Sequence, residues 1–452
     1  MAGKVTVPQG AALYIGAVLG TGVIALPALA AQVAGPASLL AWLGLVLLSI
    51  PLAATFAALG ARYPDAGGVS TYVREAFGAR AAAVVGWCFY FAIPAGAPPA
   101  AMFGGAYVAS ALGGGQRTVL LTAAAVMAVV TLANLFGVRV SGKLQLALAA
   151  LLVVLLLTAT LTALPHASAA NLRPFAPHGW LAVFPAAAVL VWSFAGWEAI
   201  TSLAGDFRRP ERDLPRATAV ALVVVGVLYL GIAAASILVL GGAGGSTGAP
   251  LAELLAVGVG GHVKPIAAAA AILLTLGTMN AYYAGSAKLG AALGRDGALP
   301  GWLARGSGGA RRSGVCGGEA GQSGTAGEVP RRSLLVVSGL SAVALAVTGV
   351  TGLGTRPLVL LTTGSFVLVY ALGAAAALRL LPRRSWSRRA AVVSLGVAAL
   401  LFAATGWYVV WTVVVAAAAV VYQATSPRRR VRAAGEPDYH PGGEGPVTVS
   451  RH

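Results

Sequence analysis

The chain has 452 residues, of which 58% are hydrophobic and only 10% are charged, and its mean hydropathy is +0.83. A soluble domain carries about a quarter charged residues, so this composition excludes the soluble classes. The net charge of +18 would suit a nucleic-acid-binding protein, but the charges fall in short stretches between apolar blocks, so we expect a lipid bilayer and no nucleic acid as the surroundings.

The apolar blocks predict an all-α polytopic membrane protein with twelve transmembrane helices, because each block has about twenty residues. One transmembrane domain covers residues 1–425. A glycine-rich stretch over 306–329 predicts a flexible cytosolic loop, and the basic stretch 426–452 predicts a disordered cytosolic tail. Lys4 precedes the first block, but a signal peptide has a shorter apolar region and is not followed by many spans, so no cleavage is expected. The expected spans are 8–33, 37–60, 81–111, 117–137, 144–165, 179–203, 217–241, 264–292, 333–352, 355–379, 389–405 and 406–423.

The positive charges predict the orientation of these spans. All but four of the 31 Lys and Arg residues fall on one side of a twelve-span arrangement; the four exceptions are Arg117, Arg173, Lys264 and Arg356. Lys and Arg accumulate in cytoplasmic loops, so both termini are predicted to be cytoplasmic.

The first and sixth spans are unusual membrane helices. Residues 16–27 read GAVLGTGVIALP, and residues 191–199 read VWSFAGWEA. Counting five spans from each gives two corresponding halves, repeat one over about 8–165 and repeat two over about 179–379, followed by two extra helices over about 389–423. Interrupted helices at matching positions of two halves indicate an inverted-repeat secondary transporter. Glycine in membrane helices also serves close packing or kinks, and this alternative stays open for either span alone.

Several motifs resemble those of the amino acid–polyamine–organocation (APC) superfamily of transporters. They are GAVLGTGVIALP (16–27), YPDAGGVSTYVREAFG (63–78), VWSFAGWEA (191–199), FRRPERDLPRA (207–217) and GRDGALPGWLAR (294–305). The nearest likeness is to the bacterial exporters of L-methionine and branched-chain amino acids, through residues 27–42, 93–101 and 210–217. The resemblance implies a LeuT-like 5+5 inverted repeat with discontinuous helices 1 and 6, in a bacterial inner (plasma) membrane.

The resemblance also implies a substrate site at the two interruptions. Gly20, Thr21 and Gly22 would form the unwound centre of span 1, whose freed N–H groups bind a carboxylate. The residues expected to supply acceptors for the substrate ammonium group are Ser193, Phe194, Ala195 and Gly196. Trp192 matches an aromatic position that closes over the substrate and gates the site, although simple packing is the alternative reading for it.

Glu198 is the acidic residue well inside a span, which is costly unless the carboxyl group is paired or faces a cavity. It is expected to serve either proton coupling and gating or a hydrogen bond to a neighbouring helix. Five further polar residues are candidates for lining the cavity, and each could instead form an interhelical hydrogen bond. These are Tyr90, Asn280, Tyr282, Tyr283 and Ser365.

The expected energy source is the proton gradient. Many relatives carry a lysine partway along span 5, but the aligned position here is Leu152, so their coupling mechanism does not transfer directly. Thr275 and Thr278 do not suffice to support a sodium site. No metal or other cofactor is expected, because Cys88 and Cys316 are not placed to pair and no metal-ligand spacing occurs.

The sequence therefore predicts a secondary active transporter of neutral apolar amino acids (methionine, leucine, isoleucine and valine), working by proton-coupled efflux and alternating access. An uptake permease or exchanger of the same superfamily is the alternative. An enzyme is not expected, because clusters of His, Asp or Cys are missing from the spans, and the chain has no GxxxxGK[ST] motif for ATP-driven transport. The oligomeric state is left open.

Overall fold

The structure is a computed structural model that describes residues 5–63, 68–137, 142–198, 204, 207–305 and 329–425. Residues 306–328 of the predicted cytosolic loop and the whole predicted tail lie outside these ranges. Within them the chain is helical, and the strand-like pairing is limited to one parallel bridge between Val5 and Phe207. The α-helices are α1 (Val7–Val18), α2 (Leu26–Ala34), α3 (Ser38–Arg62), α4 (Val69–Phe77), α5 (Ala79–Leu112), α6 (Gln116–Leu135), α7 (Gly142–Ala163), α8 (Val183–Phe194), α9 (Pro210–Leu240), α10 (Pro250–Val259), α11 (Lys264–Arg295), α12 (Arg331–Thr351), α13 (Arg356–Leu380), α14 (Trp386–Ala404) and α15 (Val409–Thr425).

Ten segments of the described chain are long and apolar enough to cross a membrane. The difference from the twelve predicted spans lies at spans 1 and 6. Helices α1 and α8 have 12 residues each, which is roughly 18 Å of helix, whereas the hydrocarbon core of a bilayer is about 30 Å thick. The all-helical, multi-span class is confirmed, and the two short helices fall at the two segments that the glycines mark as unusual.

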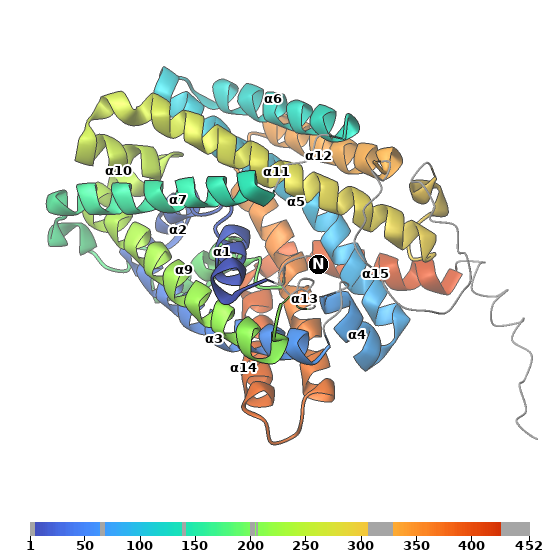
Figure 1. Ribbon diagram of the computed structural model, residues 1–452. Coiled ribbons are helices and arrows are strands. Elements are labelled where there is room, and N and C mark those ends of the chain that lie inside the picture. Colours follow the sequence, from blue (N-terminus) through green and yellow to red (C-terminus); the bar gives the residue numbers. More distant parts are fainter. Residues whose placement is uncertain are drawn as a thin grey trace, which may run out of the picture.

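Helix α5 is the central element of the bundle. It is the most buried of the ten candidate spans and packs against α6, α11, α12 and α13. Its middle reads IPAGAPPAA over 93–101, and such small residues let neighbouring helices approach closely. Figure 1 shows α5 crossing the bundle, with α1 and α2 surrounded by longer helices. Helix α1 packs against α9 and α7, and α2 packs against α8.

The periphery exposes apolar side chains in helical rows, as lipid-facing helices do. On α9, Val220, Val223 and Val227 follow one another at spacings of three and four residues and are all exposed. Such a row on one face needs an apolar environment, because leaving these side chains in water would cost free energy. The arrangement agrees with a bundle whose outer surface meets lipid and whose polar backbone breaks are kept inside it.

Candidate functional site

The first break in a helix lies between α1 and α2. Helix α1 ends at Val18, and α2 begins at Leu26. Within the break the Gly20 N–H donates to the Val18 carbonyl at 2.8 Å, and the Leu26 N–H donates to the Gly22 carbonyl at 2.8 Å. Among the residues that the structure describes, no acceptor receives the N–H groups of Thr21 and Gly22. These two donors are therefore available to a ligand beside the N-terminal end of α2, where the helix dipole favours negative charge.

The second break follows α8, which ends at Phe194. Ala195 is extended, and Gly196 has a φ of +127°, a backbone conformation that favours glycine. A Cβ atom added at Gly196 would lie 2.8 Å from the Ala17 carbonyl oxygen and 3.2 Å from the Val18 Cα. The chain after α8 therefore lies directly against the end of α1, and a side chain at this glycine would force the two breaks apart.

Gly22 provides the same close approach from the other side. A Cβ added there would lie 2.6 Å from Trp192 Cδ1 and 2.7 Å from Ser193 Oγ. Gly20 differs, because a Cβ added there would meet no atom within 4 Å. Of the two glycines, Gly22 serves packing between the breaks, and Gly20 leaves open space.

A cavity lies between the two breaks and is completed by α5, α11 and α13. About 50 Å³ of it is open to the centres of water-sized molecules, room for a few waters. Ser193 is buried, and its Oγ has no hydrogen-bond partner in the described part of the chain. The lining residues are Ala17, Val18, Gly20, Thr21, Gly22, Ala92, Ile93, Gly96, Ala97, Ala100, Trp192, Ser193, Ala195, Thr278, Met279, Tyr282, Tyr283, Thr362 and Phe366.

Eight of the residues predicted for the site line this cavity. They are Gly20, Thr21, Gly22, Trp192, Ser193, Ala195, Tyr282 and Tyr283. The structure thus brings both glycine-marked breaks and one face of α11 to a single enclosed space.

The other predicted residues lie outside the lining. Phe194 packs its ring on Trp42 and Tyr229, at centroid distances of 6.0 and 5.1 Å. The Tyr90 hydroxyl donates to the Ser333 carbonyl at 3.3 Å. The structure gives these two side chains interhelical contacts instead of a place in the cavity wall.

Asn280 and Ser365 also make helix contacts. Asn134 Nδ2 on α6 donates to Asn280 Oδ1 on α11 at 2.7 Å, and the Ser365 hydroxyl donates to the Leu361 carbonyl of its own helix at 3.4 Å. Polar side chains inside a membrane bundle commonly form such bonds. For Asn280 the observed partner matches the interhelical alternative that the sequence left open, whereas the Ser365 bond stays within α13.

Glu198 lies beside the second break and does not line the cavity. The Gly196 N–H donates to Glu198 Oε2 at 3.0 Å, and the Tyr370 hydroxyl of α13 donates to the same oxygen at 2.8 Å. The carboxyl group therefore fixes the backbone of the break and ties it to α13. This is the interhelical hydrogen bond that was one of its two expected roles.

Tyr229 on α9 is a residue that the sequence reasoning missed. Its Oη lies 2.8 Å from the Val18 carbonyl oxygen and 2.6 Å from the Ser193 carbonyl oxygen. The ring makes edge contacts with Trp42 and Phe194, so the direction of the hydroxyl is fixed. A tyrosine in the middle of an apolar span was the available signal, because such polar groups usually have a partner helix. Trp42 is also buried in this cluster.

The identity of the chain follows from a family comparison. The family model described as "Amino acid permease" matches residues 6–430, nearly the whole chain. The chain belongs to the amino acid permease family. This confirms the APC superfamily that the motifs predicted.

Three relatives of this permease illustrate its similarity to known proteins. The "Uncharacterized amino acid permease YecA" of Bacillus subtilis is 32% identical over 422 residues, covering 93% of this chain and 96% of that protein. The "L-methionine/branched-chain amino acid exporter YjeH" of Escherichia coli is 39% identical over 226 residues, 49% of this chain and 53% of that protein. The "Branched-chain amino acid permease BcaP" of Bacillus subtilis is 28% identical over 240 residues, 49% of this chain and 52% of that protein.

As an amino acid permease, the protein is a multi-pass membrane transporter and not an enzyme. Its substrate is an amino acid, a small zwitterion that needs donors for its carboxylate and acceptors for its ammonium group. The cavity of this permease offers unpaired N–H groups at Thr21 and Gly22 and the unpaired hydroxyl of Ser193. Other polar lining side chains are Thr278 on α11 and Thr362 on α13, which the sequence did not single out for the site.

Proposed function

We propose that this permease is a secondary active transporter that exports neutral apolar amino acids by alternating access, driven by the proton gradient. Methionine, leucine, isoleucine and valine are the proposed substrates. The observation that carries the proposal is the cavity between the two helix breaks, where unpaired backbone donors lie opposite an apolar wall.

The carboxylate end of the substrate binds at the break before α2. The N–H groups of Thr21 and Gly22 are free, and the N-terminal end of α2 adds a positive partial charge. An anion held this way needs no buried cation, which would be costly in a membrane. The ammonium end binds on the side of Ser193, whose hydroxyl is unpaired and whose carbonyl lies at the end of α8.

The side chain of the substrate lies against the remaining wall. Trp192, Ile93, Met279 and Phe366 are large apolar lining residues, and this surface favours aliphatic or thioether side chains over charged ones. The similarity to an exporter whose name specifies L-methionine and branched-chain amino acids supports the same substrate class.

The proposed architecture has twelve spans and a LeuT-like 5+5 inverted repeat, with both termini cytoplasmic in a bacterial plasma membrane. The two breaks occur in α1–α2 and after α8, the first elements of the two predicted halves. The loop over 306–329 and the tail 426–452 belong to the cytosolic side in this arrangement, together with most of the Lys and Arg residues.

Proton coupling is proposed through Glu198. Its carboxyl group already holds the Gly196 N–H, so a change in its charge would alter the second break directly. Sodium coupling is not part of the proposal, because Thr275 and Thr278 do not suffice to support a sodium site. Leu152, at the position where many relatives carry a lysine, is buried and apolar.

An uptake permease or exchanger is the second candidate. Alternating access is reversible, and the relatives YecA and BcaP are named as permeases without the word exporter. The two candidates share the cavity and the substrate class. They differ in the gradient that drives the substrate and in the direction in which the substrate moves.

Transport by the purified protein in liposomes tests the proposal. Labelled methionine, leucine, isoleucine or valine is followed while pH and sodium gradients are imposed one at a time. We expect counterflow of these amino acids. Under an imposed pH gradient the amino acids should move in the direction opposite to the protons, and an imposed sodium gradient should have no effect. An absence of counterflow for every neutral amino acid rejects the substrate class, and net movement with the protons supports the uptake candidate.

A further inference from the structure

A groove lies on the outside of the bundle where the segment after α11 meets the start of α12. The segment, η8 (Gly301–Ala304), is a 3-10 helix that packs against both α11 and α12. About 400 Å³ of the groove is open to the centres of water-sized molecules, and its lining residues are Trp302, Arg332, Leu335 and Val336. None of these residues lines the cavity between the two breaks. The groove is therefore separate from the substrate site.

The helix that borders the groove begins with two positive charges. Arg331 and Arg332 lie in the first turn of α12, and both are exposed. The N-terminal end of a helix carries a positive partial charge, so a cation is unfavourable there and an anion is favourable. Arg305, which directly follows η8, is a third exposed cation. The start of α12 therefore concentrates positive charge beside the groove.

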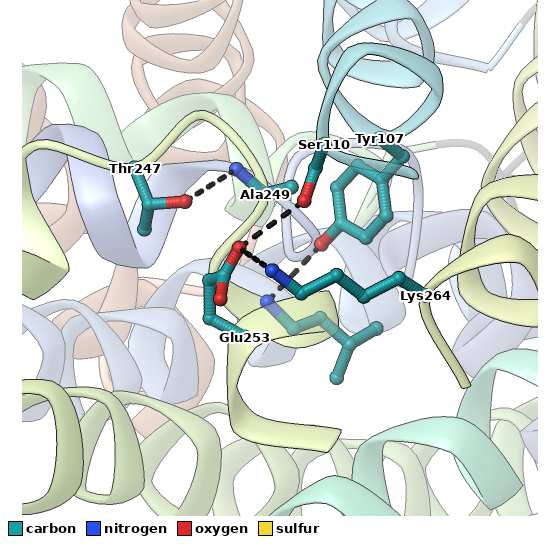
Figure 2. A network of polar contacts seen from close by, with 7 residues as sticks. Tyr107, Ser110, Thr247, Ala249, Glu253 and Lys264 are labelled. Carbon is teal, nitrogen blue, oxygen red and sulfur yellow. Dashed lines mark hydrogen bonds and ion pairs between the residues drawn. The ribbon is translucent and has the colours of Figure 1, made fainter. Parts of the chain in front are cut away.

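A comparison with α11 shows what the start of α12 lacks. Helix α11 also begins with a cation, Lys264, but there the chain supplies the counter-charge. The Lys264 Nζ lies 2.9 Å from Glu253 Oε1, as Figure 2 shows. Within the residues that the structure describes, no carboxylate forms an ion pair with Arg331 or Arg332. An anion from outside the chain would offset these two charges.

The groove continues into an apolar face of α12, which lies on the outside of the bundle beside α6 and α11 (Figure 1). Leu335, Val343 and Val347 are exposed and follow one another at spacings of eight and four residues, so they form one row. The row extends roughly 18 Å along the helix, which is enough for one leaflet of a hydrocarbon core about 30 Å thick. Trp302, 44% exposed, lies beside the arginine end of this row.

We propose that the groove binds an anionic phospholipid of the cytosolic leaflet, with the lipid phosphate on Arg332 and an acyl chain along the exposed row of α12. A guanidinium group holds phosphate oxygens through two parallel N–H bonds. Tryptophan rings favour the level of the headgroups, where Trp302 would lie. The described lining contains no carboxylate to receive the ammonium group of a zwitterionic lipid, so a headgroup with net negative charge is favoured.

The inference goes beyond the proposed transport activity. Its choice of leaflet rests on the proposed topology, in which α12 begins on the cytosolic side, where anionic lipids attract basic residues. The presence of the site does not depend on that topology, because the groove, the charges and the apolar row are properties of the fold itself.

Lipid binding by the purified full chain in detergent tests the proposal without any transport. Delipidated protein is titrated with phosphatidylglycerol or with phosphatidylethanolamine of identical acyl chains, and bound lipids are counted by native mass spectrometry. We expect phosphatidylglycerol to bind more tightly. Arg332→Gln should weaken its binding about fivefold and remove most of the preference. Arg332→Lys keeps the charge but not the paired N–H bonds, so it should have an intermediate affinity.

Matched controls separate the groove from general surface charge. Arg389→Gln removes an exposed arginine near the start of α14 that does not line the groove, and it should leave the affinity unchanged. Leu335→Gln places a polar group on the apolar row and should weaken both lipids alike. Inorganic phosphate should not displace the lipid, because it has no acyl chain. As a second readout, phosphatidylglycerol should raise the melting temperature of the wild type and of Arg389→Gln, but not that of Arg332→Gln.

Several results would overturn the inference. Equal affinity of the wild type and Arg332→Gln for phosphatidylglycerol is one, and displacement of the lipid by inorganic phosphate is another. Lipid binding that appears only after removal of residues 306–328 would assign the groove to that segment, and a dimer that is lost in Arg332→Gln would assign it to a second copy of the chain. A protein with the expected lipid preference but no amino acid counterflow would contradict the proposed substrate alone, so the two failures can be told apart.

Discussion

At the scale of single residues, the two glycines of the first break have different roles although they are two positions apart. A methyl group at Gly20 meets no atom within 4 Å and would occupy open space beside the cavity, whereas at Gly22 it collides with Trp192. Gly20→Ala should therefore fold normally and raise the KM for leucine about tenfold. Gly22→Ala should lower thermal stability as well, because overpacking costs about 1–3 kcal/mol.

The comparison uses purified protein, with melting followed by size-exclusion chromatography and KM measured by counterflow in liposomes. If Gly20→Ala transports like the wild type, the open space beside Gly20 is not where substrate binds. If both variants lose stability equally, the distinction between a packing glycine and a site glycine is wrong.

Glu198 carries the second prediction at this scale. The titratable side chains that interact with it among the described residues are Tyr370 on α13, Tyr282 on α11 and Tyr14 on α1. Glu198→Gln keeps an acceptor for the Gly196 N–H and the Tyr370 hydroxyl but cannot lose or gain a proton. We expect the variant to fold and its transport rate to lose most of its dependence on pH.

The measurement is counterflow at a series of equal internal and external pH values, with the melting temperature as a check on folding. If the pH profile of the variant were parallel to that of the wild type, Glu198 would have no role in proton coupling. Its role would then be limited to its hydrogen bonds at the second break. Loss of folding in the glutamine variant would show that the charged form itself is needed for stability.

At the scale of elements, Tyr229 joins the two broken helices to α9. Its hydroxyl has one proton and two carbonyl oxygens within reach, at Val18 and Ser193, so it donates to one of them at a time. Tyr229→Phe keeps the ring contacts with Trp42 and Phe194 but removes the donor. We expect an unchanged fold and a KM about tenfold higher for leucine, because buried carbonyl groups at the site lose their partner.

The matched control is Tyr422→Phe, because the Tyr422 ring packs against Trp87 at a centroid distance of 5.8 Å and Tyr422 does not line the cavity. A further readout tests which end of the substrate is affected. Competition by the 2-oxo acid of leucine, which has no ammonium group, should change little in Tyr229→Phe if the variant disturbs the ammonium end. Equal loss for the amino acid and the oxo acid would contradict that assignment.

The elements also show what the sequence could and could not predict. The break between Val18 and Leu26 was predictable, because glycines in a span that should be continuous are a local signal. The loss of helix after Phe194 was predictable for the same reason, because Gly196 lies in a span that should be continuous. In the structure this glycine has a φ of +127°. Helix type and apolar length are local properties of the chain, so composition and periodicity determine most of the fold class.

The partners of individual side chains were not predictable. Tyr90, Asn280 and Tyr229 are all tyrosines or amides in apolar spans, and nothing local distinguishes a cavity wall from an interhelical bond. Asn280 finds Asn134 on α6, and Tyr229 finds two carbonyl groups on other helices. Which face of a helix meets the cavity depends on rotations and crossings fixed by packing with distant segments. The same limit applies to Trp42, whose burial depends on α8 and α9.

At the scale of the whole molecule, the distribution of charge determines how the permease lies in the membrane. All but four of the 31 Lys and Arg residues belong to one side of the proposed twelve spans, and cytoplasmic loops retain such residues. A fluorescent reporter fused after His452 should therefore fold in the cytosol. Alkaline phosphatase inserted in the loop 242–249, just before α10, should be active because the proposed topology places that loop outside. The opposite pattern would invert the membrane orientation and place α10 at the cytosolic end of the cavity. If both reporters indicated the same side, this would instead contradict the five predicted spans between them, because an odd number of spans places its two ends on opposite sides of the membrane.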